Sequence, residues 1–218
     1  MPAIAFVKRN PSAALLAVQL LGLLLYPLME DSPTGRALFG VFGLVVLGAA
    51  LFVVRRSPWL TWVGGLLALP VVILSVALVI APNPRFAVWT AALEALFYFY
   101  AAGSLIAYMW HDWVATTDEL FAAGATFTLL AWAFAYVFVV CQALIPGCFG
   151  AGAAGRTWME LLFLSVAVLS SVGLSDILPV APMARGIVML EAFGGVLYIA
   201  LVVSRLVSLA TAARKDGA

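Results

Sequence analysis

The sequence predicts an all-α integral membrane protein with six transmembrane helices and one shorter, re-entrant helix. Of its 218 residues, 66% are hydrophobic and only 10% are charged, whereas a soluble domain is about half apolar and about a quarter charged. Apolar runs of about 20 residues, the length that crosses a bilayer, recur along the chain. The net charge of +1 argues against a nucleic acid as a partner, so the expected partner is the lipid bilayer.

Six runs are long and apolar enough to be spans, and turn residues separate the first five. The turns read "EDSPTG", "RRSP", "APNPR" and "HDW", all rich in residues that end helices. These connections are too short to hold a soluble ligand-binding domain. The expected spans are 12–28, 36–54, 59–81, 85–110, 119–145 and 182–209, with a cytoplasmic tail at 210–218.

The basic residues predict the orientation of the spans. With the N-terminus inside, seven lysines and arginines fall on the inner side and four on the outer side. Because inner loops carry the excess of positive charge, we expect both termini in the cytoplasm and a multi-pass protein of the inner (plasma) membrane. The inner residues are Lys8, Arg9, Arg55, Arg56, Arg205, Arg214 and Lys215, and the outer ones are Arg36, Arg85, Arg156 and Arg185.

Residues 157–169, "TWMELLFLSVAVL", are too few to cross the bilayer as a helix. Thr157 and Glu160 form a capping-box pattern, which predicts that a helix starts here. We therefore expect a re-entrant helix that enters from outside and an irregular return through 170–181. Irregular backbone at membrane depth is tolerated only where protein buries it or where it lines a water-filled path.

The stretch "SSVGLSD" at 170–176 and the helix after it resemble the selectivity filter and inner helix of the tetrameric potassium-channel superfamily. That family's filter reads T-V-G-Y-G-D, and the six positions are held here by Ser171, Val172, Gly173, Leu174, Ser175 and Asp176, after Ser170. The resemblance covers about residues 119–209. It implies a homotetramer with a pore domain, namely an outer helix, the pore helix 157–169, the filter 170–176 and the inner helix 182–209. Residues 1–118 would form a four-helix domain in the position of a voltage sensor.

The resemblance also implies how ions would be bound. Four copies would aim the backbone oxygens of Ser171, Val172, Gly173 and Leu174 at a monovalent cation, potassium by resemblance. Gly173 would have a positive φ, which lets carbonyls point inward. Asp176 would place a ring of carboxylates at the outer mouth and concentrate cations there. No cofactor other than the permeant ion is expected.

The filter departs from the family pattern at two positions. Ser175 stands where the family uses a glycine in a left-handed conformation, so we expect strain of about 1 kcal/mol per subunit there. Leu174 lacks the aromatic hydroxyl that braces the filter, and the family's aromatic partners on the pore helix fall at Phe163 and Leu164. Residues that would support the filter instead are Glu160, Phe163 and Glu191.

The inner helix carries a pair of glycines where the family often places a hinge. Gly195 lies 24 residues after Ser171, and Gly194 precedes it. Close helix packing is an equally good interpretation of this pair. The resemblance then places Val196, Ile199 and Val203 on the inner cavity, a hydrophobic lining that can gate by dewetting.

Together these patterns predict a passive cation channel rather than an enzyme. Residues 86–110 hold no basic residue, so voltage sensing of the familiar kind is not expected. The alternative is a non-conducting, channel-like sensor or partner subunit, motivated by Ser175 and the missing brace. A transporter or membrane enzyme would need repeated halves, broken helices or clustered catalytic groups, and the sequence shows none.

Four further residues have open interpretations. We expect Glu94 to be structural, either paired with a polar group in the first four helices or protonated. His111 is either an interfacial residue or a proton sensor. Cys141 and Cys148 are expected as free thiols, although Pro146 and Gly147 break the helix between them and would allow a disulfide.

Overall fold

The computed structural model describes residues 6, 9–30, 33–54, 61–81, 83–110, 116–150 and 155–216, and in this part of the chain it contains helices joined by turns and irregular segments, with no strand. Each predicted helix is present with ends within three residues of the predicted ones, except at the C-terminus. The helices are α2 (Pro11–Glu30), α3 (Pro33–Val54), α4 (Thr61–Ile80), α5 (Pro84–Met109), α6 (Thr117–Leu144), α7 (Trp158–Leu169) and α8 (Pro182–Asp216).

Four of these helices are long and apolar enough to cross a membrane within the described residues. They contain the stretches Trp62–Ile80, Pro84–Met109, Thr117–Leu144 and Pro182–Arg205. The described parts of α2 and α3 contribute shorter apolar stretches, Pro11–Tyr26 and Phe42–Val54. The class of multi-pass, all-α membrane protein is therefore confirmed, and the count of six spans stays a prediction.

The C-terminal end of α8 corrects the predicted boundary. The sequence predicted that the inner helix ends at 209 and that a tail follows, but α8 continues to Asp216. The added segment, "ATAARKD", holds neither proline nor glycine and is rich in alanine. Alanine is the best helix former, so nothing in this segment stops the helix.

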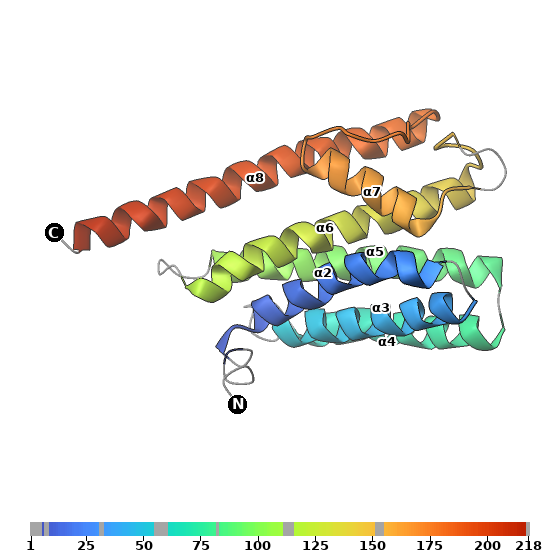
Figure 1. The fold of residues 1–218 in the computed structure, drawn as a ribbon, viewed down its shortest axis with the longest axis horizontal. Coiled ribbons are helices and arrows are strands. Elements are labelled where there is room, and N and C mark those ends of the chain that lie inside the picture. Colours follow the sequence, from blue (N-terminus) through green and yellow to red (C-terminus); the bar gives the residue numbers. More distant parts are fainter. Residues whose placement is uncertain are drawn as a thin grey trace.

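Helix α6 lies at the centre of the molecule. It contacts α2, α5, α7 and α8, and its contact with α5 is the most extensive. Helices α7 and α8 lie on one side of α6, and α2, α3 and α4 lie on the other (Figure 1). Trp132 and Leu129 of α6 are buried against Phe97 and Tyr98 of α5 in the main hydrophobic core. Helix α6 therefore connects the first four helices to α7 and α8.

The first turn of α6 binds three other helices. Asp118 accepts hydrogen bonds from the Ser12 N–H and hydroxyl, both at 3.0 Å, and from the Tyr108 hydroxyl at 3.2 Å. Its neighbour Glu119 pairs with Arg205 of α8 at 3.7 Å, and both side chains are nearly buried. Removing one partner of a buried ion pair leaves an uncompensated charge, which is strongly destabilising. Here α2, α5 and α8 meet on one helical turn, at the end where α2 begins and α8 ends (Figure 1).

Gly195 sits where α8 crosses the C-terminal end of α7. A Cβ at Gly195 would overlap the Leu169 carbonyl oxygen and lie 2.9 Å from the Leu169 carbonyl carbon. A Cβ at Gly194 would meet nothing within 4 Å. The close-packing interpretation therefore accounts for Gly195, because small residues let two membrane helices approach.

This difference predicts opposite effects for two neighbouring substitutions. Gly195→Ala is expected to destabilise the protein by about 1–3 kcal/mol, because the overlap with Leu169 is with backbone that cannot move aside. Gly194→Ala is the matched control and is expected to be neutral or stabilising by up to about 1 kcal/mol through helix propensity. Unfolding free energies of the purified variants measure both, and equal values for the two would contradict the packing role.

Candidate functional site

The N-terminal end of α7 is closed by the capping box that the sequence predicted. The Glu160 N–H donates to the Thr157 hydroxyl at 3.3 Å, and the Thr157 N–H donates to the Glu160 carboxylate at 2.7 Å. Arg156 pairs with the same carboxylate at 2.9 Å. The hydrogen bond from the Thr157 backbone, and next to it the Arg156 side chain, lower the pKa of Glu160 below its ordinary value. Glu160 therefore fixes the N-terminal end of α7.

Two further contacts hold this end of α7 to α6. The Gln142 side chain makes two hydrogen bonds to the Arg156 backbone. Its amide nitrogen donates to the Arg156 carbonyl, and its amide oxygen accepts from the Arg156 N–H, each at 2.8 Å. The Trp158 ring packs edge-on against Trp132 at 5.4 Å between centroids and lies 5.6 Å from Tyr136. Sequence reasoning did not single out Gln142 or Trp158. The sequence feature that could have identified Gln142 is the presence of a polar glutamine in the last turns of an otherwise apolar span.

A buried hydroxyl joins the middle of α7 to both neighbouring helices. The Ser165 hydroxyl lies within hydrogen-bond reach of the Ala131 carbonyl of α6, at 2.8 Å, and of the Glu191 carboxyl of α8. Ser165 and Glu191 are both fully buried. The second carboxyl oxygen of Glu191 has no hydrogen-bond partner among the described residues. The hypothesis that Glu191 reaches α7 from behind is thus matched by a direct contact, through a serine that the sequence pattern did not single out.

The C-terminal end of α7 turns through a left-handed serine. Ser171 has a φ of 61°, and its N–H donates to the Val168 carbonyl at 2.9 Å. Two residues later, the Gly173 N–H donates to the Ala167 carbonyl at 2.9 Å. This closure resembles a Schellman motif, which places a left-handed residue just after the helix. The expected positive φ of Gly173 is confirmed, at 68°.

The strain expected at Ser175 is not present, and this prediction was wrong. Ser171 is the only non-glycine residue with a positive φ in the described part of the chain. The Ser175 N–H donates to the Gly173 carbonyl at 3.1 Å, and its hydroxyl accepts the Ile177 N–H at 3.1 Å. A serine hydroxyl can complete such a local turn, which removes the need for a left-handed backbone.

The loop after α7 lies at the surface of the single chain. Val172 and Leu174 are 70% and 74% exposed, and Gly173 and Asp176 are exposed as well. Ile177, at 2% exposed, anchors the loop in a second core cluster. In the described residues no group of three or more His, Cys, Asp or Glu side chains could hold a metal ion.

The return from the loop to α8 is held by the outer connection of α6. The Cys148 carbonyl accepts the Val180 N–H at 2.8 Å and the Ala181 N–H at 3.4 Å. Cys141 and Cys148 are free, as expected, with their sulfur atoms 3.7 Å apart. Burial, and next to it the hydrogen bond to Cys141, raise the pKa of the Cys148 thiol to about 12. Two buried free thiols thus lie next to the return segment.

One face of α8 and part of α7 are not covered by the chain. The proposed cavity residues Val196, Ile199 and Val203 are exposed, and so is Phe163 on α7. Phe163 is 49% exposed, whereas its neighbour Leu164 is buried in the second cluster. These side chains leave an apolar surface beside the exposed loop.

The sequence also left Glu94 and His111 with two interpretations each. Glu94 contacts Tyr136 of α6, a partner outside the first four helices, and the alternative of a protonated Glu94 stays a prediction. The reason is that α5 packs mainly on α6, which brings a tyrosine of a later span to Glu94. His111 lies outside the described residues, and its two interpretations stay open.

Comparison with known proteins connects this geometry to a family. A family described as "ion channel" matches residues 94–212, which is more than half of the chain. The match includes α6, α7, the exposed loop and most of α8. The searches of curated proteins and of solved structures found no match.

The buried contact between Ser165 and Glu191 predicts a non-additive pair of substitutions. Ser165→Ala is expected to cost about 1–3 kcal/mol of unfolding free energy, because it removes the hydrogen-bond partner of a buried carboxyl. Ser165→Ala combined with Glu191→Leu is expected to cost less than the sum of the single changes, because both polar groups are then replaced. A double-mutant cycle measures the coupling.

The control for this cycle is a second serine at the end of the same helix. Ser170 makes a hydroxyl contact of 3.3 Å to the Ala167 carbonyl and is only partly buried. Ser170→Ala is therefore expected to change stability by about 0.5 kcal/mol or less. Additive effects for Ser165 and Glu191 would refute the coupling.

The Cys148 thiol predicts slow and pH-dependent alkylation. In the wild type, a pKa of about 12 against an ordinary 9.0 leaves roughly a thousandth of the usual thiolate at Cys148 at neutral pH, and peptide mapping distinguishes its labelling from that of Cys141. We expect labelling of the folded protein to be at least 100-fold slower than that of the unfolded protein and to accelerate about tenfold per pH unit. Fast labelling of the folded protein at pH 7 would contradict the burial of Cys148.

Proposed function

This chain belongs to the ion channel family, and we propose that four copies of it form a passive pore for monovalent cations, with potassium as the permeant ion. In this proposal residues 119–209 build the pore and residues 1–118 form the surrounding four-helix domain. Both termini lie in the cytoplasm, and the protein resides in the plasma membrane.

The exposed, irregular backbone of residues 170–180 carries the proposal. Backbone that is neither helical nor in a closed sheet cannot face lipid, because its polar groups would lack partners there. In the single chain this segment is exposed at most positions, beside the uncovered apolar face of α8. Further copies of the chain around an axis would enclose both surfaces and leave the loop facing water.

The backbone conformation of the loop supports cation binding. The φ angles of Ser171 and Gly173 are positive, and those of Val172 and Leu174 are not. A positive φ at every second residue would let neighbouring backbone carbonyls point to one side of the loop. Four such loops would present the backbone oxygens of residues 171–174 to the axis. The C-terminal end of α7, which carries partial negative charge, points to the same place.

The side chains around the loop have separate roles in this proposal. Asp176 shapes the outer mouth and attracts cations, while Ser165 and Glu191 support the filter from behind. Val196, Ile199 and Val203 line the inner cavity. Voltage does not gate the pore in the familiar way, because Arg85, at the first turn of α5, is the only basic residue of that helix.

Ion flux into liposomes tests the proposal directly. Purified tetramers are reconstituted, and potassium and sodium fluxes are compared between the wild type and Asp176→Ala. We expect a potassium-selective flux that Asp176→Ala lowers by about twofold to tenfold at low ionic strength, because a ring of carboxylates concentrates cations there. At about 1 M salt the difference is expected to vanish through screening.

Two further variants separate the outcomes. Asp176→Glu retains the charge and is expected to stay within about twofold of the wild type. Leu174→Tyr combined with Ser175→Gly restores the family's filter residues and is expected to change selectivity. Flux from this restored filter, together with none from an assembled wild type, would refute conduction and favour the non-conducting, channel-like subunit.

A further inference from the structure

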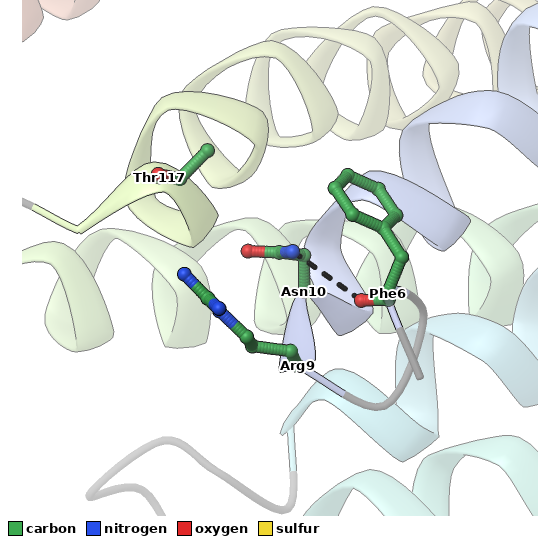
Figure 2. A pocket seen from close by; sticks show the side chains of 4 residues that line it. All are labelled: Phe6, Arg9, Asn10 and Thr117. Carbon is green, nitrogen blue, oxygen red and sulfur yellow. Dashed lines mark hydrogen bonds between the residues drawn. The ribbon is translucent and has the colours of Figure 1, made fainter. Parts of the chain in front are cut away.

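A pocket lies between the start of α2 and the start of α6, away from the loop that follows α7 (Figure 2). Its volume is about 380 Å³, and it is lined by Phe6, Arg9, Asn10 and Thr117. The lining combines a guanidinium group, an amide, a hydroxyl and an aromatic ring. None of these groups takes part in the proposed pore.

The positive charge of Arg9 is not neutralised by the described residues. Arg9 is exposed, it forms no ion pair in the described part of the chain, and its guanidinium group extends toward Thr117 (Figure 2). The two nearest acids on the α6 turn are already engaged, Asp118 with three hydrogen bonds and Glu119 with Arg205. The N-terminus of α6 adds partial positive charge at Thr117. The pocket is therefore suited to an anion.

Asn10 adds a second kind of contact. Its side chain is nearly buried, and its amide nitrogen donates to the Phe6 carbonyl at 3.3 Å. The amide oxygen accepts no hydrogen bond from the described residues and points away from Phe6 (Figure 2). It can accept a hydrogen bond from a hydroxyl group of the ligand. A phosphate that carries a hydroxylated substituent meets both requirements.

The position of the pocket identifies the source of such a ligand. The apolar part of α2 begins at Pro11, directly after Asn10, and the apolar helix α6 begins at Thr117. Ends of membrane helices lie at the level of the lipid headgroups. Phe6, 48% exposed, offers an apolar ring next to the pocket. Anionic lipids supply phosphate groups at this depth and attract basic residues near the surface.

We propose that this pocket binds the phosphate group of an anionic phospholipid, with Arg9 and Thr117 on the phosphate and Asn10 on a headgroup hydroxyl. The lipid occupies the leaflet on the side of the N-terminus. The next residue but one after Asn10 is Ser12, whose bonds to Asp118 dock α2 on α6. A bound headgroup therefore also stabilises the contact between α2 and α6, through the binding energy that it contributes only to the folded state.

Native mass spectrometry of the purified full-length protein tests the site with phosphatidylglycerol and phosphatidylcholine as probes. We expect tighter binding of phosphatidylglycerol, and Arg9→Gln is expected to weaken it about tenfold, the loss typical of one charged hydrogen bond. Arg85→Gln is the matched control, because it also removes one arginine charge. Arg85 lies in the first turn of α5, whereas Tyr108, which binds Asp118 of α6, lies at the opposite end of α5. It is expected to bind as the wild type does. A phosphatidylglycerol-dependent rise in melting temperature, absent in Arg9→Gln, is the second readout.

Competition with inorganic phosphate distinguishes a phospholipid from free phosphate as the ligand of this pocket. Phosphatidylglycerol binding that depends on Arg9 and resists millimolar phosphate supports the lipid as the ligand. Phosphate that binds through Arg9 while phosphatidylglycerol does not would overturn the lipid and leave a site for free phosphate. Equal binding by Arg9→Gln and the wild type, equal loss in Arg85→Gln, or equally tight phosphatidylcholine binding would overturn the proposal. None of these outcomes depends on whether the protein conducts ions.

Discussion

A helix of 12 residues that cannot cross the bilayer sets the main constraint on this structure. Both ends of α7 lie where backbone groups need partners that lipid does not provide. The outer end obtains them from the Thr157 and Glu160 capping box and from Gln142. The inner end obtains them from the left-handed turn at Ser171 and from Gly173. The loop that follows can keep a defined shape only because both ends are fixed.

Helix α7 is held sideways by small and polar groups rather than by large apolar ones. Gly195 lets α8 approach the Leu169 backbone, and Ser165 reaches both Ala131 and Glu191. Between membrane helices, lipid competes equally well for apolar side chains, so close approach and hydrogen bonds provide the specificity. The position of α7, and with it the start of the loop that follows, therefore depends on these buried contacts with α6 and α8.

Different kinds of interaction hold the helices together at the two ends of the molecule. At the outer end the contacts are an aromatic cluster and backbone hydrogen bonds, such as those of Cys148 to the return segment. At the other end Asp118 and Glu119 are adjacent, and they bind α2, α5 and α8 through charged groups. Any movement of α2 relative to α6 must change the bonds of Asp118, one residue from the ion pair that holds α8. The pocket lined by Arg9 and Thr117 lies next to this junction.

The sequence by itself determined the class, the helices and the local features of the site. Apolar length defines the helices, the Thr157 and Glu160 spacing defines the start of α7, and a glycine at 173 allows a positive φ, because each of these is set by neighbouring residues. Only the tertiary structure decided the long-range contacts. Glu191 meets Ser165 from 26 positions away, and Ser12 meets Asp118 from 106 positions away.

The same distinction explains the wrong prediction of a strained Ser175. The left-handed residue is Ser171 rather than Ser175, because the end of α7 and the Gly173 bond to Ala167 fix the turn. The contact of Glu94 with Tyr136 likewise depends on α5 packing on α6, which local sequence does not encode. Local patterns report the backbone preferences of a few residues, whereas packing between helices selects which of those preferences is used.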